Sequence, residues 1–195
     1  METVDLGGVT SLPNDNTFRD CTNLTSIIVR EPLNSPQQNA FSGCSSLVNI
    51  YITDVGKWCS SSFSTNAAAY SPCRANTLTK NLYLNGTKVT SITVPNSITS
   101  LPNHIFTYCD ITSIILPSGL TSIGVYAFKS SKLTAIRIPN SVTTIGNACF
   151  HGCYDMEIFI LGSAFTGNTN TETFRALNSL KTLISLNSTP PPTNF

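Results

Sequence analysis

The sequence predicts a solenoid, a fold in which short coils of similar sequence stack along one axis. Two observations indicate it. Apolar residues recur about every 22 residues along most of the chain, and each period has the same order of short strand, proline and closing turn. A unit of this size cannot bury its apolar edges alone, so each coil needs neighbours. We expect roughly seven to eight coils and little helix, because return segments rich in Ser, Thr and Gly favour turns.

The clearest unit runs from Leu133 to Asp155, with the sequence LTAIRIPNSVTTIGNACFHGCYD. Its L-x-x-I-x-I spacing places alternate isoleucines on one face of a short strand. Pro139 ends the strand, because proline has no N–H to donate to a ladder. Gly146 permits a turn that a β-carbon would hinder. Phe150 and Cys153 then close the coil with one large and one small buried side chain.

Further copies of this unit cover most of the chain. The complete copies and the degraded ones toward both ends are Val4 to Asn23, Leu24 to Ser46, Val89 to Asp110, Ile111 to Lys132, Met156 to Ser179 and a last one beginning at Leu180. We expect their parallel strands at Ile27–Val29, Ile50–Ile52, Ile92–Val94, Ile114–Leu116, Ile136–Ile138 and Phe159–Leu161. The whole chain, 1–195, is therefore predicted to be one domain whose two ends are truncated repeats.

One segment departs from the period. Residues 54–88 separate the strand at Ile50–Ile52 from the next strand-ending proline, and they end in alternating apolar residues around Asn85-Gly86. Asn-Gly in that setting is a strong β-hairpin signal. We predict an insert, 54–88, that leaves the coil and returns through a hairpin.

Seven cysteines raise the question of disulfide bonds. Four of them follow a phenylalanine by three residues and are predicted to be buried free thiols: Cys21, Cys44, Cys109 and Cys153. Cys59 and Cys73 lie in the insert, off this ladder position. A bridge between them in a secreted protein and two free thiols both remain open.

The sequence offers little for a metal or for catalysis. Cys149, His151 and Cys153 are close in sequence, but Cys149 and Cys153 occupy core positions of the repeat, and no fourth zinc ligand is visible. His104 and His151, the only histidines, fall two coils apart, and no hydrolase, metalloprotease or nucleotide-binding motif occurs. We predict no enzyme, no cofactor and no metal site.

Composition narrows the classes of partner. Only 11% of residues are charged and the formal net charge is +1, which does not favour nucleic acid or an acidic membrane surface. No apolar run approaches the ~20 residues that span a bilayer. Glu2 to Gly8 already fall inside a repeat, and no signal-like leader precedes them.

The exposed face of the strands is the predicted binding surface. In each strand one residue lies between the two inward positions and faces solvent, and these residues are Ile28, Tyr51, Thr93, Ile115, Arg137 and Ile160. Apolar stripes rimmed by polar groups mark interaction sites, although β-branched residues are also simply good strand formers. The insert is expected to add a second wall with Trp58, Phe63, Tyr70 and Tyr83, of which only one or two are available to a partner because the others pack the insert onto the coil.

The repeat resembles the BspA-like leucine-rich repeat family. The segments that carry the resemblance are Leu116 to Gly124, LPSGLTSIG, and Ile138 to Gly146, IPNSVTTIG. Trp58-Cys59, followed by Asn81 to Gly86, is similar to an insert that this family uses. The resemblance implies a right-handed leucine-rich repeat solenoid, an α/β-type repeat architecture of short parallel strands with turn or 3-10 return segments. It also implies an extracellular or cell-surface location on a host-associated bacterium.

Three functions follow for testing. The first is a non-enzymatic, adhesin-like binding module for a protein or glycan, and the resemblance extends this to host extracellular matrix. The second is a structural spacer that presents other domains. The third is an enzyme with an unrecognised site. A binding module predicts a clustered apolar stripe, a spacer a uniformly polar surface, and an enzyme a cleft with convergent titratable groups.

Overall fold

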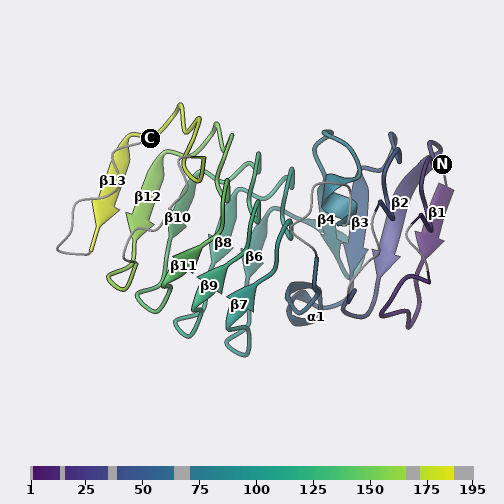
Figure 1. Cartoon of the computed structure of the whole chain (residues 1–195), viewed down its shortest axis with the longest axis horizontal. Helices are drawn as coiled ribbons and strands as arrows, with labels where there is room; N and C mark the ends of the chain where they lie inside the picture. Colours follow the sequence, from purple (N-terminus) through teal and green to yellow (C-terminus); the bar gives the residue numbers. More distant parts are fainter. Residues whose placement is uncertain (1, 14–15, 35–38, 64–70, 166–171, 187–195) are drawn as a thin grey trace.

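The computed structural model of the chain describes residues 2–13, 16–34, 39–63, 71–165 and 172–186. It is a solenoid of about seven turns, built mostly from parallel strands, with the two chain ends at opposite ends of the stack (Figure 1). The predicted fold class is confirmed.

The first sheet contains the amino-terminal coils and the hairpin. Its five strands, in spatial order, are β1 (Glu2–Asp5), β2 (Leu24–Val29), β3 (Asn49–Ile52), β4 (Asn81–Leu84) and β5 (Thr87–Val89). All neighbours are parallel except β4 and β5, which are antiparallel and joined by Asn85 and Gly86 at φ angles of 49° and 82°. The predicted Asn-Gly hairpin is confirmed.

The carboxy-terminal coils continue the same face of the solenoid in two smaller sheets. One sheet pairs β6 (Ser91–Thr93) with β8 (Ser113–Ile115), and the other has the order β10 (Ala135–Arg137), β12 (Ile158–Leu161) and β13 (Thr182–Ser185). All six predicted strands form, although β6, β8 and β10 each begin and end one residue earlier than predicted. The ladder between them is less continuous than expected, because β5 ends the first sheet before β6 and because β8 and β10 lie in separate sheets.

A third side of the coil carries a small sheet where turns were expected. It contains β7 (Ser100–Leu101), β9 (Ser122–Ile123) and β11 (Thr144–Ile145), all parallel. Gly124 and Gly146 follow two of these strands. A β-carbon on Gly146 would lie 2.4 Å from the backbone nitrogen of Val125. Glycine is therefore needed for the close approach of neighbouring coils, and not for the turn itself.

The insert contains two short helices that the sequence did not predict, α1 (Val55–Cys59) and a 3-10 helix (Pro72–Arg74). Asp54 caps α1, since its carboxylate accepts a hydrogen bond from the backbone N–H of Lys57 at 2.7 Å. In Figure 1, α1 lies below the gap between β4 and β6. The bounds of the insert, 54–88, remain a prediction.

Asn76 and Lys80 attach the insert to the coils on both sides. The Asn76 amide donates to the carbonyls of Cys44 and Leu47 at 2.8 and 3.0 Å. On the other side, the Lys80 N–H donates to the carbonyl of Tyr108 at 2.8 Å. The Lys80 side chain is buried, and its amine donates to the Asn76 side-chain oxygen at 2.8 Å. Burial lowers the pKa of Lys80 to about 8.

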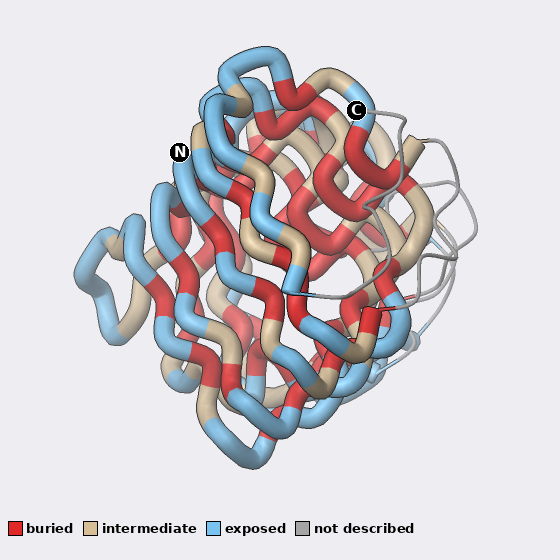
Figure 2. The backbone as a smooth tube through the Cα atoms, turned by 90° about the vertical axis from the view of Figure 1, so that its left-hand side faces the viewer, coloured by how far each residue is buried: buried red, intermediate tan, exposed pale blue. Residues whose placement is uncertain are grey.

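A column of phenylalanine rings forms the centre of the carboxy-terminal half. Phe106, Phe128, Phe150 and Phe174 stack with consecutive ring centroids 5.6, 5.4 and 6.1 Å apart and interplanar angles of 12°, 8° and 3°. All four are buried. Viewed along the stack, buried residues line the inside of successive coils and exposed residues lie at the outer corners (Figure 2). Each ring therefore covers the next coil's ring.

Polar side chains on the surface also join one coil to the next. The hydroxyls of Thr112 and Thr134 each donate to a carbonyl 22 residues earlier in the chain, at 3.3 Å. Ion pairs do the same, for example Arg30 with Asp5 at 2.7 Å. Hydrogen bonds from Arg30 hold the pKa of the Asp5 carboxyl at about 2. Exposed ion pairs contribute little to stability because solvent screens them, so the aromatic column is the larger source of stability.

Replacing Phe150 with alanine tests this column. Phe150 stacks on Phe128 and Phe174 and is fully buried, so the truncated side chain leaves a cavity between coils. We expect Phe150→Ala to lower the free energy of unfolding by about 3–5 kcal/mol, and Phe150→Leu by about 1.5 kcal/mol. Urea denaturation followed by circular dichroism measures both. A loss below about 1 kcal/mol for Phe150→Ala would show that the rings do not hold the coils together.

Candidate functional site

The predicted strand-face residues lie on the outer side of the solenoid as adjacent pairs. The register places Ile28 beside Tyr51, Thr93 beside Ile115, and Arg137 beside Ile160. Thr93, Ile115 and Arg137 are exposed, and the other three are half-buried. The sequence did not single out Ile184, which continues the row beyond Ile160 and is 43% exposed. Applying the same strand pattern to the last unit, which begins at Leu180, would have identified Ile184 as an outward residue.

Tyr51 belongs to a different part of this face from Arg137. It stacks on Tyr83 of β4, with ring centroids 4.4 Å apart and an interplanar angle of 15°. Both rings are half-buried. Tyr51 lies in the first sheet and Arg137 in the last, with the hairpin between them (Figure 1). The two residues therefore lie in separate sheets of the outer face.

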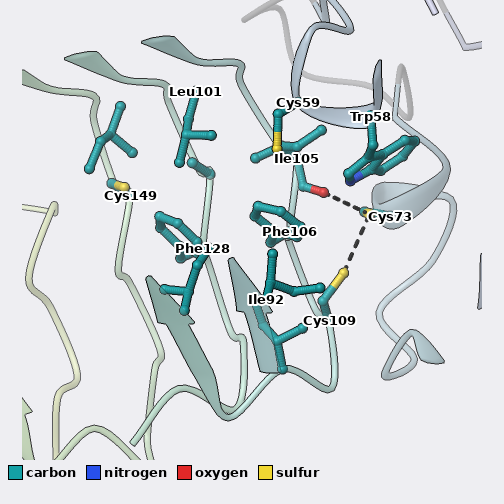
Figure 3. Close-up of a cluster of buried hydrophobic side chains, with 14 of the residues drawn as sticks. Trp58, Cys59, Cys73, Ile92, Leu101, Ile105, Phe106, Cys109, Phe128 and Cys149 are labelled. Atoms are coloured by element: carbon teal, nitrogen blue, oxygen red, sulfur yellow. Dashed lines mark hydrogen bonds between the residues drawn. The ribbon is translucent and has the colours of Figure 1, made fainter. Parts of the chain in front are cut away.

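Trp58 is not available to a partner, contrary to the sequence expectation. It is 1% exposed and packs against Phe63, which is 3% exposed, with ring centroids 5.9 Å apart. Figure 3 shows the indole directed into the buried cluster below α1. Tyr70 lies outside the described residues. The aromatic residues of the insert that are described thus pack it onto the coils, because an α-helical turn at Val55–Cys59 directs Trp58 inward.

A groove of about 430 Å³ opens on the strand face between β8 and β10. Its lining residues are Ile114, Ile115, Leu116, Ser118, Arg137, Pro139 and Asn140. The groove lies where the ladder is interrupted, since β8 and β10 belong to separate sheets. Ile115 on its wall is 61% exposed, the highest value among the large hydrophobic residues of the described chain.

Arg137 is the one basic residue without an internal partner among the described residues, which include all eleven lysines and arginines. Seven basic residues form ion pairs: Arg19, Arg30, Lys57, Lys88, Lys132, Arg175 and Lys181. Arg74 and Lys129 lie over the ring of Tyr126, at 5.2 and 5.0 Å from its centroid, and Lys80 is the buried lysine described above. The guanidinium at the groove is therefore free to pair with an anion.

A second hollow of about 510 Å³ lies on the third side of the coil. It is bounded by Ser61 to Phe63 of the insert and by β7, β9 and β11. Its walls are serine, threonine, glycine, asparagine, proline and aliphatic residues and one phenylalanine, with no charged side chain among its described lining residues. This hollow is larger than the groove but chemically neutral.

The two histidines do not form a catalytic pair. His104 is 1% exposed and its Nδ1 has no hydrogen-bond partner among the described residues. Burial, with smaller contributions from Arg74 and Lys129, lowers the pKa of His104 to about 4. His151 is half-buried, and burial also lowers its pKa. His104 stacks on Tyr126 at 5.0 Å, which is a packing role.

The ladder cysteines behave largely as predicted. Cys44, Cys109 and Cys153 are fully buried, whereas Cys21 is half-buried because it belongs to the truncated first unit. Burial raises the pKa of Cys44 and Cys153 to about 11. Cys73 contacts Cys109, with 3.5 Å between the two sulfurs. In the described chain, no three His, Cys, Asp or Glu side chains gather in a way that would hold a metal ion.

A family profile described as BspA type leucine rich repeat region matches residues 2–70 and 76–189 in six copies. No curated protein matches the chain. No helix among the described residues is long and apolar enough to cross a membrane.

Three solved structures are similar to the chain. They are a leucine rich cell surface protein from Faecalibacterium prausnitzii (24% identity, TM-score 0.47) and leucine-rich repeat proteins from Bacteroides ovatus (23%, 0.44) and Eubacterium ventriosum (16%, 0.47). The matches cover 80%, 93% and 83% of this chain. They cover 46%, 39% and 49% of those chains, so this chain spans less than half the length of each.

The buried His104 predicts a pH dependence of stability. Its pKa is about 4 in the folded protein and 6.5 ordinarily. Between these values the unfolded chain binds a proton that the folded chain does not, so the free energy of unfolding falls as the pH drops from 6.5 toward 4. Asparagine tolerates the positive φ of 57° at this position. Between pH 7 and pH 4.5, we expect the free energy of unfolding of His104→Asn to fall by about 2–3 kcal/mol less than that of the parent.

Urea denaturation of both proteins at the two pH values measures this difference. His151→Asn is the matched control, because His151 is only half-buried and should change the pH dependence less. An identical pH dependence in the parent and in His104→Asn would contradict a neutral, buried His104.

Proposed function

Because the chain belongs to the BspA-type leucine-rich repeat family, we propose that it is a non-enzymatic binding module of the cell surface that recognises a protein partner through the outer strand face. A solenoid presents an extended surface whose outward residues are free to vary without loss of the core. Here the contact is centred on the groove between β8 and β10, with Ile160 and Ile184 continuing it along the sheet. The partner is extracellular, and host matrix proteins are the first class to test.

The observation that carries this proposal is the free guanidinium of Arg137 beside the exposed side chain of Ile115. A planar guanidinium forms bidentate hydrogen bonds with a carboxylate, and this contact is stronger than one between neutral groups. Ile115, at 61% exposed, has apolar surface to bury in the same contact. An acidic side chain flanked by aliphatic residues on the partner would satisfy both groups at once.

Several features of the groove support binding rather than catalysis. Arg137 is the only titratable side chain among its described lining residues, so no acid or base lies beside it. His104 is buried, and its low pKa keeps it neutral near pH 7. Binding without chemistry therefore fits the groove better than a reaction does.

A spacer is the alternative function, and one observation favours it. Most surface charges and many threonine hydroxyls are used between coils, as in the pairs Arg30–Asp5 and Lys181–Glu157. A surface that serves mainly to hold the stack together would suit a stalk that presents another domain. The strand face around Ile115 is the exception to this pattern.

Binding of the protein to a panel of extracellular matrix proteins and glycans, measured by biolayer interferometry, tests the proposal. For a protein that binds, we expect Arg137→Gln to raise Kd about tenfold or more through loss of the charge-assisted contact, and Ile115→Ala to raise it a few-fold. Both side chains are exposed, so the free energy of unfolding should change by less than about 0.5 kcal/mol.

Arg19→Gln is the matched control, because Arg19 is also an exposed arginine but lies at the other end of the stack. It should leave Kd unchanged. A partner that binds Arg137→Gln and Ile115→Ala as tightly as the parent would place the site elsewhere. Binding restricted to glycans would argue against a protein partner, and no binding across the panel would favour the spacer.

A further inference from the structure

The insert interrupts the row of cysteine side chains at one point. The thiols of Cys44 and Cys153 each donate a hydrogen bond, 3.0 Å long, to the carbonyl of a phenylalanine on the preceding coil, Phe18 and Phe128 respectively. Cys109 occupies the same position in its own repeat. The insert stands where the preceding coil would supply such a carbonyl, and there the Cys109 sulfur contacts the Cys73 sulfur instead, at 3.5 Å.

Cys73 is held against this coil by neighbouring hydrogen bonds. Its thiol donates to the carbonyl of Ile105 at 3.2 Å, which Figure 3 shows together with the contact to Cys109. Ser71, which caps the 3-10 helix, accepts from the Cys73 N–H and donates to the carbonyl of His104, both at 3.2 Å. Cys73 and Cys109 are both fully buried. The fold therefore brings the two sulfurs into contact before any bond joins them.

We propose that Cys73 and Cys109 form an intramolecular disulfide that fastens the insert to the following coil. This differs from the Cys59–Cys73 bridge that the sequence left open, and also from the free thiol that the sequence predicted for Cys109. Cys59 lies on α1, and its thiol makes no hydrogen bond to Cys73 among the described residues. A bridge between Cys73 and Cys109 would join the insert to the coil that follows it. That coil also contains Phe106, the first ring of the phenylalanine column.

Oxidised glutathione is a suitable oxidant, by thiol–disulfide exchange. The thiolate of one cysteine attacks the glutathione disulfide, which gives a protein–glutathione mixed disulfide and one glutathione thiolate. The thiolate of the other cysteine then attacks the protein sulfur of the mixed disulfide and releases the second glutathione. The two protein thiols lose two protons and two electrons, and one glutathione disulfide becomes two thiols.

The bridge forms while the chain folds rather than afterwards. The hydrogen bond that the Cys109 thiol donates to the Cys73 sulfur, together with burial, raises the pKa of Cys109 well above its ordinary value, and the Lys80 ammonium opposes this only in part. Because the thiolate is the reactive form, the folded, reduced protein reacts slowly. Because both sulfurs are fully buried, the bridge, once formed, is also protected from attack by small thiols.

Refolding of the denatured, reduced protein in a glutathione redox buffer, followed by alkylation and trypsin digestion without reduction, tests the proposal. Cleavage after Lys57, Arg74, Lys88 and Lys129 produces peptides 58–74 and 89–129. We expect these two peptides to be linked and five of the seven cysteines to be alkylated. The melting temperature of the oxidised form should exceed that of the reduced form by about 10 °C.

Matched variants identify the partner, because peptide 58–74 contains both Cys59 and Cys73. Cys59→Ala should keep the link, and Cys73→Ala should abolish it. Cys73 lies in the insert rather than in the repeat ladder, so its variant keeps the coil intact if Cys109→Ala fails to fold. Seven alkylated cysteines after refolding, or a link that persists in Cys73→Ala, would overturn the proposal.

Discussion

Every coil of this protein depends on its neighbours to cover its apolar edges, and the phenylalanine column is where that dependence is greatest. Phe128 and Phe150 are each covered on both faces by a ring of the adjacent coil. Spacing between coils is then set by the close approach of backbones, which leaves no room for a β-carbon at Gly124 or Gly146. Threonine hydroxyls and ion pairs reinforce a spacing that the core already imposes.

Unusual chemistry occurs at the insert and at one break in the strand ladder. At the insert, a buried lysine and two thiols in contact replace the repeating partners, because Lys80 and Cys73 come from outside the period. Between β8 and β10 the ladder is broken, and the strand face opens into the groove that holds the unpaired Arg137. The regular coils, in contrast, use their polar groups to bond to one another. Candidate functions therefore concentrate at the insert and at the break in the strand ladder between β8 and β10.

The strands, the hairpin and the outward positions could be predicted because a 22-residue period determines which side chains of a coil point inward. Contacts across the insert could not, since residues 36 apart such as Cys73 and Cys109 share no period. Trp58 was misplaced for the same reason: outside the repeat, an aromatic residue carries no signal of the face that it occupies. The groove was missed because Ile115 and Arg137 were recognised individually, while the break in the ladder between them depends on local strand pairing.

We propose that the strand face at β8 and β10 is the accessible binding surface of the stack. Methyl NMR of the protein labelled at isoleucine δ1 carbons, titrated with a matrix protein that binds it, tests this most directly. We expect the Ile115 methyl signal to shift first, while the signal of Ile123, which lines the neutral hollow on the third side, does not change. Shifts at Ile123 with an unchanged Ile115 signal would contradict it.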